Sequence, residues 1–174
     1  MDKKFSNQTD RIILEVKTSR TGEETPEVMV QFLTSLVGLK KRFLLLWRKG
    51  IPFTLEIGVA DQVIHFYISI PAKYRSFIES QLISQYPKAM ITLVKDFIPD
   101  ILANNQACVR QLKLSSSFLY PIRTFKDFKE VDPMSSLLGA LSKAKPNVKA
   151  AVQLLLVPVN SSWQGKGERA IYVK

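Results

Sequence analysis

Apolar and polar residues alternate along three stretches in the first half of the chain, as they do in β-strands that bury one face. The first stretch is residues 11–17, and the other two are residues 51–59 and 62–70. Only Ala60 and Asp61 separate the second stretch from the third, and β-hairpins prefer a gap of that length. The pattern therefore predicts one strand, followed later in the chain by a hairpin.

Apolar residues also recur at helical spacing in two segments. Thr25 precedes Pro26 as an N-cap precedes a proline in the first turn, so a helix is expected to begin there. Its end is open, because Gly38 is a natural stop but the pattern also permits a helix that runs on to about Arg48. A second helix is expected over residues 72–86, between two prolines.

A further strand is expected at residues 89–97. The order over residues 11–97 is then strand, helix, strand, strand, helix, strand. This order is that of the split βαβ, or ferredoxin-like, unit, and it places the chain in the α+β class.

The remainder of the chain predicts a second, incomplete βαβ-type unit over residues 107–174, packed against the first. Residues 1–10 form a polar N-terminal tail, and residues 98–106 a connector. The expected elements are a strand at 107–115, a short helix at 124–130, a helix at 133–144 capped by Asp132, and a strand at 150–159. The last strand is almost continuously apolar, which is typical of a strand buried on both faces.

The composition narrows the possible chemistry. Hydrophobic residues make up 46% of the 174 residues, which is typical of a globular chain. The 25 Lys and Arg against 15 Asp and Glu give a net charge of +10, which favours nucleic acid or an anionic membrane as partner. Cys108 and His65 are the chain's lone cysteine and histidine, so disulfide scaffolds and zinc modules are excluded. No apolar run approaches the roughly 20 residues that cross a bilayer, so a soluble, cytoplasmic chain is expected.

The sequence contains no convincing set of candidate catalytic residues. The segment Gly165-Lys166-Gly167 lacks the remaining residues of a phosphate-binding loop. His65 is expected at a surface or interface rather than in catalysis, and Cys108 as a small buried hydrophobe. The carboxylates form no assignable acid–base pair. We therefore predict no catalytic, cofactor-binding or metal-binding residues and no enzymatic activity.

One stretch is unusual, because residues 40–49 (KKRFLLLWRK) place five cations around an apolar centre. Such a segment suits a membrane surface, a protein partner or nucleic acid, although the simpler and favoured reading is that its leucines are buried inside the domain while the cations stay solvated. The candidate patch consists of Lys40, Lys41, Arg42, Trp47, Arg48 and Lys49. Recognition of RNA bases by the sheet is disfavoured, since Tyr67 is the single aromatic expected on the exposed strand face.

Four segments, residues 25–38 (TPEVMVQFLTSLVG), 52–97, 120–143 and 152–167, resemble the domain that precedes the motor in bacterial conjugation and type IV secretion-like ATPases of the HerA/FtsK type. They share with it an FxxxL helix, an FYxxxP strand end, a QYP helix end and an FxxxDP segment. The resemblance implies a membrane-proximal segment ahead of this domain and the motor, with its GxxxxGK[ST] motif, after it. No ligand residues carry over.

The resemblance implies a non-catalytic interaction or assembly module at the inner face of the membrane, with no cofactor and with itself or secretion-machine subunits as partners. The alternative is a stand-alone basic protein that binds nucleic acid non-specifically. A small enzyme of acylphosphatase-like shape is a third reading, but the chain has no recognisable anion-binding loop.

Overall fold

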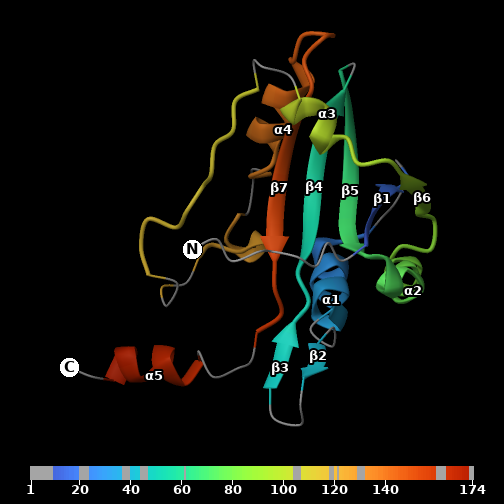
Figure 1. The fold of residues 1–174 in the computed structure, drawn as a ribbon. Helices are drawn as coiled ribbons and strands as arrows, with labels where there is room; N and C mark the ends of the chain where they lie inside the picture. The colour runs from blue at the N-terminus through green and yellow to red at the C-terminus, as the bar shows by residue number, and fades with distance from the viewer. Residues whose placement is uncertain are drawn as a thin grey trace, which may run out of the picture.

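The computed structural model describes residues 10–19, 24–36, 40–43, 47–60, 62–103, 107–117, 120, 122–128, 132–159 and 164–172. The strands are β1 (Arg11–Lys17), β2 (Lys40–Phe43), β3 (Trp47–Gly50), β4 (Phe53–Ala60), β5 (Val63–Pro71), β6 (Met90–Val94) and β7 (Ala150–Leu156). The α-helices are α1 (Pro26–Leu36), α2 (Arg75–Gln85), α3 (Ile98–Leu102), α4 (Ser135–Ser142) and α5 (Gln164–Tyr172), with 3-10 turns η1 (Ala72–Tyr74) and η2 (Phe125–Asp127). Figure 1 shows their arrangement.

The main sheet has five strands in the order β6-β1-β5-β4-β7, and all neighbours are antiparallel. Without β7, this is the strand order of a ferredoxin-like unit. The structure thus confirms the α+β class and the split βαβ arrangement. Strands β2 and β3 pair separately as a two-stranded hairpin between α1 and β4.

One face of the sheet is covered by α1 and α2. Their buried residues Phe32, Leu36, Ile78 and Leu82 form one cluster with strand residues such as Leu14. Other members of the cluster are Ile51, Phe53, Ile68 and Ile70. Burial of a side chain of this size contributes about 1.5–3 kcal/mol, so this layer is the main source of stability.

The predicted β4–β5 hairpin is confirmed, because Ala60 pairs with Val63 across a two-residue loop. Gln62 in that loop has a φ of 65°, in the left-handed region that glycine favours. Of the two ends left open for α1, the extension to about Arg48 is wrong and the stop near Gly38 agrees with the structure: the helix ends at Leu36, and β2 begins at Lys40. Residues 40–43 instead satisfy their backbone groups in a ladder with β3.

The second half departs from expectation in two places. No strand forms at residues 107–115, where the described chain is irregular and exposed, and Cys108 is accordingly exposed rather than buried. Strand β7 is not buried on both faces, because it lies at the edge of the main sheet. The expected connector contains α3, and Gly165-Lys166-Gly167 lies within α5.

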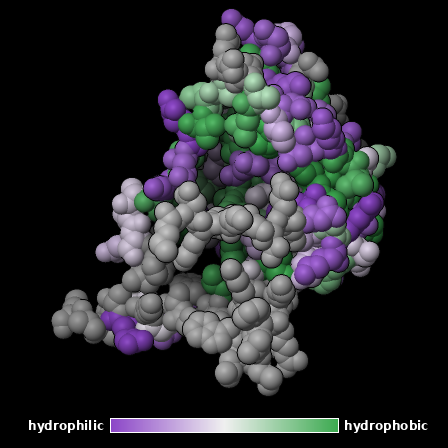
Figure 2. Space-filling model, in the orientation of Figure 1, coloured by the Kyte–Doolittle hydropathy of each residue, from purple (hydrophilic) through white to green (hydrophobic). Residues whose placement is uncertain are grey.

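The helix expected at 133–144 is confirmed as α4, over Ser135–Ser142. The Asp132 carboxylate accepts a hydrogen bond from the backbone N–H of Met134 at 2.8 Å, close to the capping role that the sequence predicts. Figure 2 shows apolar side chains at the surface over the upper part of the view, where Figure 1 places α3 and α4.

Candidate functional site

The face of the sheet opposite α1 and α2 carries most of the sheet's charged and polar side chains. Side chains alternate along a strand, so residues next to core positions in β1, β4 and β5 point to this second face. They include Arg11, Glu15, Thr54, Glu56, His65, Tyr67 and Ser69. Strand β7 adds Gln153, which lies opposite Glu56 in the ladder.

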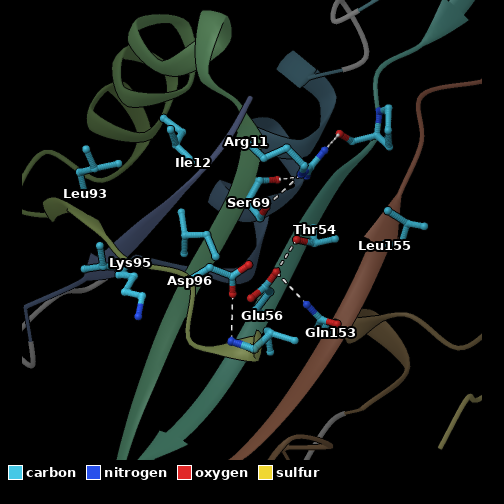
Figure 3. A pocket seen from close by; sticks show the side chains of 14 residues that line it. Arg11, Ile12, Thr54, Glu56, Ser69, Leu93, Lys95, Asp96, Gln153 and Leu155 are labelled. Carbon is cyan, nitrogen blue, oxygen red and sulfur yellow. Dashed lines mark hydrogen bonds between the residues drawn. The ribbon is translucent and has the colours of Figure 1, made fainter. Parts of the chain in front are cut away.

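A pocket of about 670 Å³ lies on this polar face. Arg11 lines it and is held by three hydrogen bonds: Nε donates to Ser69 Oγ (3.2 Å), Nη2 to the Ser69 carbonyl (2.7 Å) and Nη1 to the Pro52 carbonyl (3.1 Å). Figure 3 shows the guanidinium extending across β5 toward the chain before β4. Arg11 thereby ties β1 to the two strands of the central hairpin.

Glu56 is the buried acid of the pocket, with an exposed fraction of 4%. Its Oε1 accepts hydrogen bonds from Thr54 Oγ1 (2.6 Å) and Gln153 Nε2 (3.0 Å). Its Oε2 is buried without a hydrogen-bond partner in the described structure. In Figure 3 the Glu56 carboxylate is turned toward that of Asp96, which lines the same pocket and caps the N–H of Ile98.

Burial and a neighbouring charge act on the pKa of Arg11 in opposite directions. Burial lowers the pKa of Arg11, because it penalises the charged guanidinium, and the negative charge of Glu56 partly raises it again. Arg11 remains charged, since arginine is protonated at every ordinary pH. Three of its five N–H donors bond to the protein's own oxygens and join β1 to β5 and to the chain before β4. Strand β7 is joined separately, through the bond between Gln153 and Glu56 of β4.

A second polar cluster lies further along the same face. His65 Nδ1 donates to Glu15 Oε1 at 2.5 Å, and Lys17 Nζ lies 3.1 Å from Glu15 Oε2. Burial alone would raise the pKa of Glu15, but the hydrogen bonds from His65 and Lys17 outweigh it and hold the pKa below its ordinary value. The sequence prediction that His65 lies on the face away from the core is confirmed, and Glu15 is the partner that sequence reasoning did not assign.

Two aromatic rings cover this cluster. Tyr67 stacks on His65 with ring centroids 5.9 Å apart, and Phe97 packs on Tyr67 at 4.9 Å. Burial, followed by the charges of Glu15 and Glu56, raises the pKa of Tyr67. The phenol therefore stays neutral, and the two rings cover the hydrogen-bonded pair of His65 and Glu15.

The predicted patch lies on the β2–β3 hairpin. The register places Lys41 opposite Lys49 and Arg42 opposite Arg48, while Lys40 faces Gly50. In the same ladder Trp47 is opposite Phe43. The backbone thus brings the six predicted residues, Lys40, Lys41, Arg42, Trp47, Arg48 and Lys49, onto one short ribbon; what their side chains contact lies outside the described structure.

The outer edge of β7 is apolar. Val152, Leu154 and Leu155 are all substantially exposed, as are Val157 and Val159 just beyond the strand. An uncharged edge of this kind is a template for pairing with another strand. Within the described residues, β7 and β6 are the two edge strands of the main sheet.

Sequence reasoning missed Arg11, Glu56, Asp96 and Gln153 as one group. A charged residue in the middle of an apolar strand, as Glu56 is in β4, is the signal that was available. Its partner Gln153 is 97 residues away and is brought to it only by the β4–β7 register. That pairing joins the two halves of the chain and has no local signature.

These features define an α+β domain with a ferredoxin-like strand order and an added edge strand. A family model described as "Domain of unknown function (DUF8128)" matches residues 2–173, so the chain belongs to that family. No curated protein and no solved structure matches it. Among the described residues, no helix is long and apolar enough to cross a membrane, and no three His, Cys, Asp or Glu side chains are grouped to hold a metal ion.

Proposed function

We propose that this chain is a non-catalytic interaction module that takes part in the assembly of a conjugation or type IV secretion-like ATPase. The observation that carries the proposal is the uncharged, exposed edge of β7, including Leu154 and Leu155. Exposed apolar surface of this kind is costly for a monomer and is typical of interaction sites. The resemblance to pre-motor domains suggests that the assembly is that of a conjugation or type IV secretion-like ATPase.

The polar face supports the same proposal. Its charged side chains are hydrogen-bonded to polar groups of neighbouring strands, as Arg11 is to Ser69 and Glu15 to His65, which suits a rigid scaffold. In this proposal the ATP-driven step, which would move DNA or protein, belongs to the motor, and the module acts at the inner face of the membrane. Its partners are other copies of itself or secretion-machine subunits.

A deletion tests the proposal. The motor polypeptide that carries this module is purified with and without residues 1–97, and its mass is measured by light scattering. Loss of the hexamer-scale particle on deletion is expected, because the ferredoxin-like unit holds the sheet to which β7 belongs. Removal of residues 1–10 alone is the control and should leave the particle intact. Normal assembly without residues 1–97 would refute the proposal.

A second candidate function is non-specific nucleic-acid binding, favoured by the β2–β3 register that sets Lys41 opposite Lys49 and Arg42 opposite Arg48. A two-stranded ribbon fits the major groove of DNA, and the net charge of +10 attracts it. Affinity should then fall steeply with salt, and charge reversal at Lys40, Lys41, Arg42, Arg48 and Lys49 should abolish it. Absence of binding at low salt would exclude this function.

A further inference from the structure

Residues 107–115 (ACVRQLKLS) have the composition of a strand but do not form one. Their alternation favours a strand, and yet the described chain there is neither helix nor strand. Leu112 is 90% exposed, and Val109 and Leu114 are each more than 60% exposed. Figure 1 shows this yellow segment standing away from the body of the molecule on the side of β7. Exposed leucine and valine in an extended segment indicate surface that another surface covers.

The outer edge of β7 is a strand edge without a partner among the described residues. The strand Ala150–Leu156 (AAVQLLL) contains no charge, proline or glycine, which are the residues that ordinarily protect an edge from pairing. Among the described residues β7 pairs with β4 alone, so the backbone groups on its other side have no strand partner. Leu154, in the middle of this edge strand, is 56% exposed.

We propose that residues 107–115 of one chain pair as a strand with the outer edge of β7 in a second copy of the chain. The pairing would satisfy backbone groups on both segments and would extend the five-stranded sheet by one strand. Leu112 and Leu114, which share one side of a strand, would then lie beside the apolar side chains of β7. Both surfaces that the monomer leaves exposed are covered by one contact.

A second copy is the occupant because the segment and the edge belong to the same chain but do not pair within it. If each of two chains donates its segment to the other, both edges are covered at once and the assembly closes as a two-fold dimer. This inference deepens the proposed function, on which it rests, by naming the surfaces through which copies associate.

The charge balance gives the contact a distinctive salt dependence. Each chain carries +10, and neither β7 nor the 107–115 segment contains an acidic residue. Long-range repulsion between two such chains is screened by salt, while burial of apolar surface is not weakened by it. Association through this contact therefore strengthens with salt, which is opposite to the behaviour of a contact with nucleic acid.

The oligomeric mass of the 174-residue chain tests the proposal. Light scattering coupled to gel filtration is expected to show twice the mass of one 19.8 kDa chain, with the dimer favoured at higher salt. Leu112→Lys and Leu154→Lys should each restore the mass of a single chain without changing the circular dichroism spectrum, since both positions are exposed in the monomer. Met90→Lys on the β6 edge, where Met90 is 65% exposed, is the matched control and should leave the dimer intact.

Cross-linking locates the contact. One chain keeps Cys108, and the other carries Cys108→Ser with one new cysteine at Val152, Leu154, Val157 or Val159. A disulfide between the two chains requires Cα atoms within about 7 Å. At least one β7 position should therefore cross-link under mild oxidation, whereas Met90→Cys on β6 should not.

Three results would overturn the inference: the mass of one chain throughout the soluble range, a dimer that survives Leu112→Lys and Leu154→Lys, or cross-linking to β6 in preference to β7. Each of these leaves the proposed function standing on its own test, because the motor can depend on residues 1–97 through another surface. Conversely, a β7-linked dimer together with normal motor assembly after the deletion would support this contact and refute the proposed function.

Discussion

The ring of Phe97 lies directly against the backbone of Gly58. A Cβ atom built on Gly58 would come within 2.8 Å of Phe97 Cζ and 2.9 Å of Tyr67 Cε2, closer than carbon atoms approach in folded proteins. The absence of a side chain in the middle of β4 therefore lets the residue just before α3 close over the polar face of the sheet. In this way the connector between the two halves is fixed to the first half.

Gly58→Ala should destabilise the protein by about 1–3 kcal/mol, because the added methyl group forces the two rings apart. The measurement is urea denaturation followed by circular dichroism. Gly139→Ala in α4 is the matched control, since a Cβ there meets nothing within 4 Å, and it should stabilise by about 0.5–1 kcal/mol through helix propensity. Equal stability of the Gly58→Ala variant and the parent would contradict the packing described.

Removal of the Glu15 charge should cost about 1–3 kcal/mol at neutral pH, because the hydrogen bonds from His65 and Lys17 lose their anionic acceptor. The pKa of Glu15 is lowered in the folded state, so its stabilising contribution is present above the unfolded value of 4.5 and is lost as the pH falls through the folded value. The gap in unfolding free energy between the parent and Glu15→Gln should therefore shrink below about pH 4.5.

Glu79→Gln provides the comparison for Glu15. Glu79 pairs with Arg75 one helical turn away on the exposed side of α2, and such a pair contributes about 0.3–0.5 kcal/mol. Denaturation at a series of pH values measures both variants. A Glu15→Gln variant that loses no more stability than Glu79→Gln would show that the His65 pair is not the stabilising contact argued above.

Replacement of Glu56 separates its hydrogen bonds from its charge. Glu56→Gln can keep an oxygen for Thr54 and Gln153 and removes the oxygen that is buried without a partner, so its stability should stay within about 1 kcal/mol of the parent. Glu56→Ala removes the acceptor and leaves Arg11 without its nearby negative charge, and it should lose about 2–4 kcal/mol. Thermal denaturation of both variants measures these losses. A Glu56→Ala variant as stable as Glu56→Gln would show that the hydrogen bonds of Glu56 contribute little to stability.

Gln62 offers a stabilising substitution. Its φ of 65° is strained for a residue with a side chain, by roughly 1–2 kcal/mol, and glycine adopts it without strain. Gln62→Gly should therefore stabilise the hairpin by about 0.5–1 kcal/mol after the entropic cost of glycine is subtracted, and Gln62→Val should destabilise it. A lower melting temperature for Gln62→Gly would argue against this turn geometry.

The first half of the fold could be predicted from its sequence because its signals are local. The alternation in residues 51–70 and the proline that begins α1 specify elements whose partners lie close by in the chain. The second half depends on distant pairing: β7 is apolar enough to suggest burial on both faces, but its place at the sheet edge follows from its pairing with β4. Similarly, the segment 107–115 has strand composition but no strand partner among the described residues.

The candidate site also has features that the local sequence predicts and features that depend on distant pairing. The face on which His65 lies follows from the two-residue period of β5, whereas its bond to Glu15 depends on how β1 is aligned against β5. Glu56 of β4 and Asp96, between β6 and α3, line one pocket that exists only in the folded chain. The cationic patch at residues 40–49 was recognisable from composition, and its pairing as a hairpin was not.

The native coding sequence on both sides of codons 1–174 tests the central claim most directly. An assembly module of a conjugation or type IV secretion-like ATPase predicts a hydrophobic segment encoded upstream and a GxxxxGK[ST] motif encoded downstream in the same reading frame. Finding both would identify the motor whose assembly is to be measured. A stop codon directly after Lys174 would contradict the account and would favour a basic protein that binds nucleic acid.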